Sequence, residues 1–273
     1  MIRDDLLPPE LGYSKSYSGL KSGETGIWYE TYRSHVNCCL SITPLIHRDS
    51  YWHLDLDKLT SIVECHDAGK LDPEFKNRLK PKNRGDIDNW ARHEVLSFCA
   101  WLEDEAGGTP TKIDKIGALA ILGHHKTAID DRKAEEVERY ISQMPNYLEV
   151  YNKWLSIYDR DIRDGGMVDH TLLESLKYAD ALRAIDSTAS FIEKTALYKY
   201  ASDKGWYDGK IPKSMVQEAE GMGFYYAKEL VPYDLPTDQI EIIDEHLLDG
   251  VLMIDINLLG AEITLEYHQE MRS

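Results

Sequence analysis

Apolar residues in the first two thirds of the chain recur every three or four positions, the spacing of a helix that buries one face. The clearest case is 56–65, which ends directly before a His-Asp pair. Pro44 is expected to stop the first helix, and Asp169 to cap the last one. The predicted helices of this part of the chain are 35–42, 56–65, 89–102, 115–122 and 172–192.

The pattern changes near residue 206. One more helix is predicted over 214–230. After it, 251–256 and 261–267 alternate apolar and polar residues, as strands do when one face is buried. The two short strands, with a glycine between them, predict a β-hairpin at the C-terminus.

These patterns define the fold class and the domains expected of the chain. It is mainly α, with a helical bundle over residues 1–205. Residues 206–273 are expected to form an extension, in which a helix and a small C-terminal β-hairpin pack on the bundle. The segment before Gly26, which is rich in Gly, Ser and Tyr, is expected to be irregular or β-like.

Composition narrows the class of protein. The 273 residues are 42% hydrophobic, enough for a buried core, and no run of about 18 apolar residues predicts a membrane span. The four cysteines lack the Cys-x-x-Cys spacing of a zinc site, and the N-terminal residues lack the apolar region of a signal peptide. We therefore expect reduced thiols, a cytoplasmic location and no membrane partner.

The net charge of −17 bears on the substrate. A nucleic-acid-binding protein usually presents a basic surface, whereas this acidic chain repels phosphate. Bound divalent cations would offset part of that charge, and residues 76–84 contain five lysines or arginines. The charge argues against a stand-alone, tight nucleic-acid binder, but it is compatible with a nuclease that a partner supplies with substrate.

Histidines and an aspartate recur in the predicted helices in a pattern typical of a two-metal site. Cleavage of a phosphodiester at neutral pH needs an activated water and a stabilised phosphate, and two divalent metals about 3.5–4 Å apart supply both. Asp67 is the natural bridging carboxylate, and His66 beside it would ligate one metal. The remaining candidates are His93, His124 and His125, which would surround the other metal. Lys70 follows His66 by one helical turn and would hold a phosphate oxygen.

The order of these residues carries more weight than any one of them. A single histidine on an apolar helix face is most often a hydrogen-bonded core residue, and a His-Asp dipeptide is common by chance. The ordered set of His-Asp-x-Gly-Lys, Arg-His-Glu and Gly-His-His is not common by chance. The histidines without such context are expected at surface or capping positions: His47, His53, His170, His246 and His268.

Three stretches resemble a known family. They are 66–75 (HDAGKLDPEF), 92–97 (RHEVLS) and 121–125 (ILGHH). Together they resemble the CRISPR-associated HD nuclease, the stand-alone Cas-three double-prime subunit of type I systems, over roughly residues 15–195. In that family a histidine on the first core helix and a late aspartate complete the site, and His35 and Asp180 match these positions.

The resemblance implies an HD-domain helical bundle and a divalent-metal-dependent phosphodiesterase, an endonuclease or exonuclease. Single-stranded DNA is the implied substrate, with RNA as a further candidate. A separate CRISPR helicase and the guide-RNA surveillance complex are the implied partners, because the chain has no Walker motif of its own for ATP. The implied cofactors are two divalent ions, drawn from Mn, Ni, Co, Mg, Fe and Zn. The implied metal ligands are His35, His66, Asp67, His93, His124, His125 and Asp180, with Asp67 and Lys70 as the catalytic residues.

Two other classes of protein stay open. One is an HD phosphohydrolase of nucleotides or cyclic nucleotides, which fits the acidic charge better. The other is a non-enzymatic interaction subunit with structural metals, which gains only if His93 or the pair His124 and His125 points away from Asp67.

The late aspartate has a competitor on the same predicted helix. Asp180 and Asp186 are six residues apart, about 120° around the axis, so the two cannot face one metal. Leu176 and Ala184 flank Asp180 and favour a buried face, whereas Asp186 is placed to pair with Arg183 at the surface. The sequence therefore predicts Asp180 as the ligand.

Overall fold

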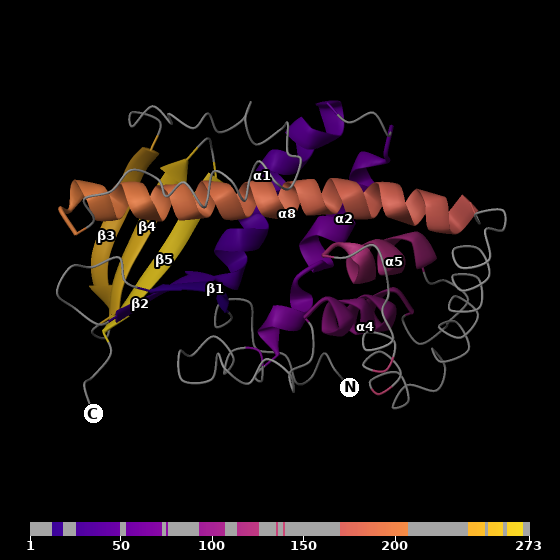
Figure 1. Cartoon of the computed structure of the whole chain (residues 1–273), viewed down its shortest axis with the longest axis horizontal. Helices are drawn as coiled ribbons and strands as arrows, with labels where there is room; N and C mark the ends of the chain where they lie inside the picture. Colours follow the sequence, from indigo (N-terminus) through magenta and orange to yellow (C-terminus); the bar gives the residue numbers. More distant parts are fainter. Residues whose placement is uncertain are drawn as a thin grey trace. The chain divides into compact units, whose positions relative to one another are not determined.

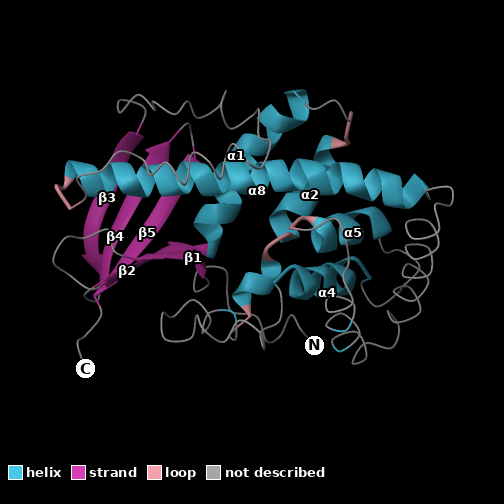
Figure 2. Ribbon diagram, in the orientation of Figure 1, coloured by secondary structure: helices cyan, strands magenta, loops and turns pink. Residues whose placement is uncertain are grey.

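The computed structural model describes residues 13–18, 26–49, 53–72, 75, 93–106, 114–125, 135, 139, 170–206, 240–248, 251–258 and 261–269. Within them the chain is mainly α with a β-sheet appendage (Figure 2). It divides into two compact units. The first comprises residues 1–7 and 49–183, and the second comprises residues 8–48 and 184–273.

The first unit is helical and carries the His-Asp pair. Two of its helices begin at aspartate caps: the Asp55 carboxylate accepts from the backbone amide of Lys58 at 2.9 Å, and the Asp114 carboxylate from that of Ile116 at 3.1 Å. The helices of this unit are α2 (Leu56–Cys65), the 3₁₀ helix η3 (Ala68–Leu71), α4 (His93–Ala106), α5 (Lys115–Gly123) and the first part of α8 (His170–Asp203) (Figure 1).

A close backbone contact holds η3 against α4. Gly69 has no room for a side chain, because a Cβ there would lie 2.6 Å from Leu96 Cβ and clash with the carbonyl oxygen of His93. Its backbone amide donates to the hydroxyl of the buried Ser97 at 2.9 Å. The glycine of the His-Asp-x-Gly-Lys motif therefore lets the turn after α2 approach the start of α4.

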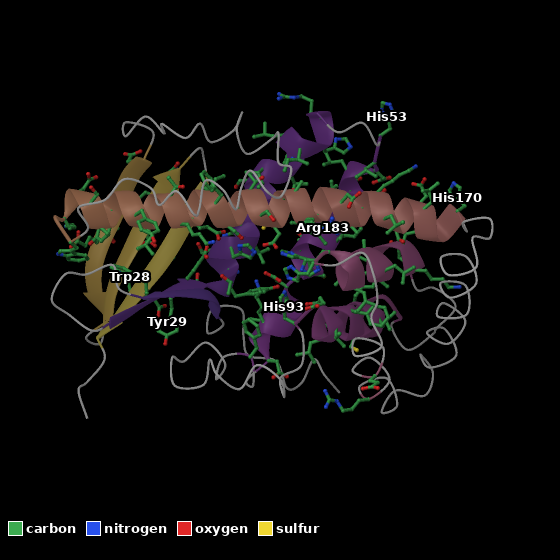
Figure 3. All side chains as sticks on the ribbon, viewed as in Figure 1. Trp28, Tyr29, His53, His93, His170 and Arg183 are labelled. Carbon is green, nitrogen blue, oxygen red and sulfur yellow. The ribbon has the colours of Figure 1, made fainter. Side chains whose placement is uncertain are left out.

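The second unit contains α1 (Tyr32–Asp49, up to residue 48), the rest of α8 and all the described strands. These are β1 (Tyr13–Ser18), β2 (Gly26–Thr31), β3 (Ile240–Leu248), β4 (Val251–Leu258) and β5 (Ala261–Gln269). They form one antiparallel sheet in the order β1-β2-β5-β4-β3. On β2, the fully buried Trp28 meets Tyr200 of α8 edge to face, with ring centroids 5.8 Å apart, while Tyr29 lies on the other side of the strand (Figure 3).

Several predicted elements are confirmed. The helix over 56–65 has the predicted bounds, the helix over 115–122 is one residue longer, and 172–192 lies inside α8. The C-terminal hairpin is present as β4 and β5, and the segment before Gly26 contributes a strand. The sheet is larger than expected, because the hairpin pairs on one side with β2 and on the other with β3.

The expectation that Pro44 stops a helix is wrong, because α1 continues through it to residue 49. Pro44 is exposed, so its ring lies on the solvent side of the helix. Water can there bond to the helix carbonyl that would otherwise accept from the backbone amide that proline lacks. The preceding residue, Thr43, turns its hydroxyl back to the carbonyl of Cys39 at 2.8 Å.

The expected domain boundary between residues 205 and 206 also needs correction. The division falls within α8, between residues 183 and 184, and residues 8–48 group with the C-terminal part. The cause is the pairing of β2 with β5, which ties the N-terminal segment to the C-terminal hairpin.

Other expectations lie outside the described residues: the helix over 214–230, the start of the helix over 89–102, the cap at Asp169 and the basic segment 76–84. Among the helices in the described ranges, none combines the length and the apolar character needed to cross a membrane.

Candidate metal centre

In the first unit several histidines lie near the buried carboxylate of Asp67. This residue follows α2 directly and precedes η3. Its oxygens lie 3.4 Å from Nε2 of His66 and 3.3 Å from Nε2 of His93. Lys70 donates to the same carboxylate at 2.5 Å and is itself buried. Two imidazole nitrogens, one from the end of α2 and one from the start of α4, thus converge on one carboxylate.

Two of the histidines are oriented by the same kind of hydrogen bond, from the ring to a backbone carbonyl. His66 caps the C-terminus of α2, and its Nδ1 lies 2.7 Å from the carbonyl oxygen of Val63. His124 caps α5, and its Nδ1 lies 2.6 Å from the carbonyl oxygen of Ile121. In each ring Nδ1 carries the proton and donates it three residues back, which leaves Nε2 with the lone pair. Metal-ligating histidines are commonly held in this way.

The donor set fits a divalent metal. Nε2 of His124 is buried and has no hydrogen-bond partner among the described residues, a costly arrangement that a cation would relieve. His93, His124 and His125 offer nitrogens that all lie within 4.8 Å of one another. Imidazole and carboxylate ligands of this kind suit Mn, Fe, Co, Ni and Zn.

The cluster is compact enough for the rings to touch. The ring centroids of His124 and His125 lie 4.0 Å apart, and those of His93 and His125 lie 4.7 Å apart. The Nε2 atoms of His93 and His125 are 2.8 Å apart, a contact in which one nitrogen donates and the other accepts. His53 and His170 are exposed and lie apart from His93, as expected of surface positions (Figure 3).

Burial keeps the centre of the cluster uncharged. It lowers the pKa of His124 well below its ordinary value, and the neighbouring His125, His66 and His93 lower it further. The carboxylate of Asp67 acts in the opposite direction and does not compensate. His124 therefore stays neutral near pH 7, the protonation state that binds a metal.

Arg183 is a supporting residue that the sequence did not reveal in this role. Its Nε donates to the carbonyl oxygen of His124 at 2.9 Å, and Nη2 lies 3.4 Å from the carbonyl oxygen of Gly123. These are carbonyls at the C-terminal end of α5, where a cation is favoured by the helix dipole. Arg183 thus holds the end of α5 that carries His124 (Figure 3).

The contacts of Arg183 also distinguish the two late aspartates, Asp180 and Asp186. Its Nη1 donates to Asp180 at 3.1 Å, and the Asp180 side chain is 45% exposed, so the expected surface pair with Asp186 is wrong. Asp180 belongs to none of the possible ligand groups among the described residues. The buried Asp186 instead lies 3.1 Å from Nε2 of His35. Burial and the contact with His35 therefore favour Asp186 over Asp180 as a candidate ligand, and Asp186 shares its helix face with the buried Leu182 and Ala189.

The second unit holds His35 in a different setting. Its Nδ1 lies 2.8 Å from Glu193, and a further glutamate, Glu30, offers an oxygen within 4.8 Å of both. The thiol of Cys39 lies 3.8 Å from Nε2 of His35. Burial raises the pKa of Cys39 to about 11, although His35 acts to lower it. Sequence reasoning missed Glu30, Cys39 and Glu193. The only available signal for Glu193 was its spacing of seven residues from Asp186, which puts both on one face of α8.

No family model matches the chain, and the searches of curated proteins and of solved structures returned no match. The resemblance to the CRISPR-associated HD nuclease therefore stays a prediction that rests on the motifs.

Proposed function

We propose that this chain is a divalent-metal-dependent HD nuclease that cleaves single-stranded DNA, with RNA as a second substrate. The observation that supports it most is the convergence on Asp67 of Nε2 atoms from His66 and His93, beside the buried Nε2 of His124. A two-metal phosphodiesterase needs such a bridging carboxylate surrounded by neutral imidazoles.

The roles of the chain's own residues follow from their contacts. Asp67 is the bridging ligand, and His66, His93, His124 and His125 are the nitrogen ligands. When bound, the metals would supply the acidity that activates water at neutral pH and the positive charge that stabilises the phosphate. The carbonyls of Val63 and Ile121 keep their histidines in the ligating tautomer.

The proposal gives Lys70 two roles, one beside Asp67 and one toward the substrate. In the structure its ammonium group donates to Asp67, so a positive charge already lies beside that carboxylate. A bound metal would neutralise the negative charge of Asp67 in place of the Lys70 ammonium group. We assign the ammonium group to a phosphate oxygen of the substrate, for which a lysine serves as a point charge.

The biological setting is taken from the resemblance. The chain would act in type I CRISPR interference, with a separate helicase that supplies unpaired strands and a guide-RNA surveillance complex that selects the target. This division of labour accommodates the net charge of −17, because a partner delivers the strand. The interpretation as a subunit with purely structural metals gains only if His93 or the pair His124 and His125 points away from Asp67. The 3.3 Å contact of His93 with Asp67 does not meet the first of these conditions.

The direct test is metal-restored cleavage. Metal-stripped protein is incubated with circular single-stranded DNA, then with Mn, Ni, Co, Mg or Zn added back singly. We expect cleavage only after metal addition, no cleavage of intact duplex DNA, and a steep loss of activity with salt. Parallel reactions contain nucleotides and cyclic nucleotides. Turnover of these with no cut in the DNA circle would favour the small-molecule phosphohydrolase and contradict the nuclease.

A further inference from the structure

The surroundings of His35 in the second unit place three kinds of donor atom at one point. Both His35 and Glu193 are fully buried, and Glu193 accepts from Nδ1 of His35 at 2.8 Å. This bond fixes the ring from behind, as the carbonyls of Val63 and Ile121 do for the other histidines. Nε2 of His35 therefore faces the opposite side, where Asp186 lies at 3.1 Å.

Cys39 completes this group. It follows His35 by four residues on α1, so the two side chains lie on the same helix face. Its sulfur lies 3.8 Å from Nε2 of His35, the same nitrogen that Asp186 approaches. The neighbouring Cys38 is just as buried but turns elsewhere, with its sulfur 4.0 Å from the carbonyl oxygen of Ala189.

We propose that Cys39 is a metal ligand beside His35 and Asp186, and that it makes this site select thiophilic divalent ions. Nitrogen, carboxylate and sulfur donors together suit Zn, Co and Ni, whereas Mg and Mn prefer oxygen. On binding, the thiol releases its proton to solvent and the sulfur donates an electron pair to the metal. Nothing is oxidised or reduced. The inference rests on the proposed metal dependence and adds to it the class of ion.

Cobalt reports a sulfur ligand directly, because a thiolate bound to Co²⁺ gives a charge-transfer absorption in the near ultraviolet. Metal-stripped wild-type protein, Cys39→Ser and Cys38→Ser are titrated with Co²⁺. We expect the absorption in the wild type and in Cys38→Ser, the matched control, and its loss in Cys39→Ser. We also expect the preference for Zn over Mn to fall about tenfold or more in Cys39→Ser.

A second measurement covers the case in which Cys39→Ser does not fold. X-ray absorption of the Zn-loaded wild-type protein should show one sulfur neighbour at about 2.3 Å. Cobalt binding without a thiolate signal in the wild type, or an equal signal in folded Cys39→Ser, would overturn this inference and leave the proposed nuclease intact. A wild-type protein that binds no divalent ion would contradict both.

Discussion

Two polar clusters in the described part of the chain differ in the chemistry of their donor groups. In the first unit several imidazoles surround one carboxylate, whereas in the second unit one imidazole lies among carboxylates and a thiol. At the centre of the first cluster, burial and the neighbouring histidines lower the pKa of His124. The first cluster thus offers mainly imidazole nitrogens to a metal. The second brings together acidic groups, whose negative charges a bound cation would offset.

The clusters also differ in how each histidine is oriented. His66 and His124 donate Nδ1–H to carbonyls three residues earlier on their own helices. His35 donates to Glu193, which lies 158 positions further along the chain. Orientation in the first unit is therefore a local property of helix ends, while in the second unit it depends on the tertiary fold.

Apart from the substitution of Asp67, the largest expected effect comes from a change in the second cluster. Asp186→Ala should lower metal-dependent activity by about a hundredfold or more, as His35→Ala should, because each removes a donor atom of the same pair. Initial cleavage rates at saturating metal, together with the metal content of each variant, measure this. A folded Asp186→Ala protein that keeps wild-type activity would contradict the reassignment of the late aspartate.

The next effect tests how tightly the first cluster depends on backbone packing. Gly69→Ala forces a Cβ against His93 and Leu96, and such overpacking costs about 1–3 kcal/mol. We expect a lower melting temperature and a loss of activity, because His93 is displaced from Asp67. Gly123→Ala is the matched control.

The control differs in the space around it. A Cβ at Gly123 meets only Ala179, at an ordinary 3.8 Å, so this variant should be as stable as the wild type or more so. Equal melting temperatures of Gly69→Ala and Gly123→Ala would show that the contact of η3 with α4 does not constrain the site.

A smaller effect follows from the neutral state of the first cluster. The pKa of His124 is lowered in the folded protein, and that of an unfolded histidine is about 6.5, so the unfolded chain binds the proton first. The stability that His124 contributes is present above about pH 6.5. It is lost as the pH falls below that value, by up to about 1.4 kcal/mol per pH unit. Melting of metal-free protein between pH 5 and 8, compared with His124→Asn, measures the slope, and an unchanged slope in the variant would exclude this cause.

The smallest effect is expected from substitution of Asp180. Asp180 is half-exposed and pairs with Arg183 at the surface, so Asp180→Ala should change the free energy of unfolding by less than about 1 kcal/mol. Its metal content should equal that of the wild type. A loss of activity in Asp180→Ala greater than in Asp186→Ala would restore the original assignment.

The same contrast explains what could be predicted from sequence. The first cluster was visible because its residues come in short motifs at helix ends, and because helix spacing located α2 and α5. The mainly helical class and the C-terminal hairpin were predictable from periodicity for the same reason. Long-range pairing was not, so the alignment of β2 with β5 and the division within α8 were missed.

The choice between the two late aspartates shows the limit of local spacing. Neighbours on one helix indicate little about the burial of Asp180 and Asp186, because burial depends on which residues of the rest of the fold pack against each helix face. The better signal was the set of buried residues around Asp186, including Leu182 and Ala189. Glu193 and Cys39 belong to no motif: Glu193 contacts His35 from 158 positions away, and the four-residue spacing of Cys39 from His35 is common in helices.

The central claim is that the imidazole cluster around Asp67 is the catalytic metal centre, and substitution of this one carboxylate tests it most directly. Asp67→Ala and the isosteric Asp67→Asn are compared with the wild type on circular single-stranded DNA at saturating Mn, with folding checked by circular dichroism. We predict folded variants that bind less metal and give no detectable cleavage, because both changes remove the charged bridging ligand. A well-folded Asp67→Ala protein that cuts the circle at near the wild-type rate would contradict the account.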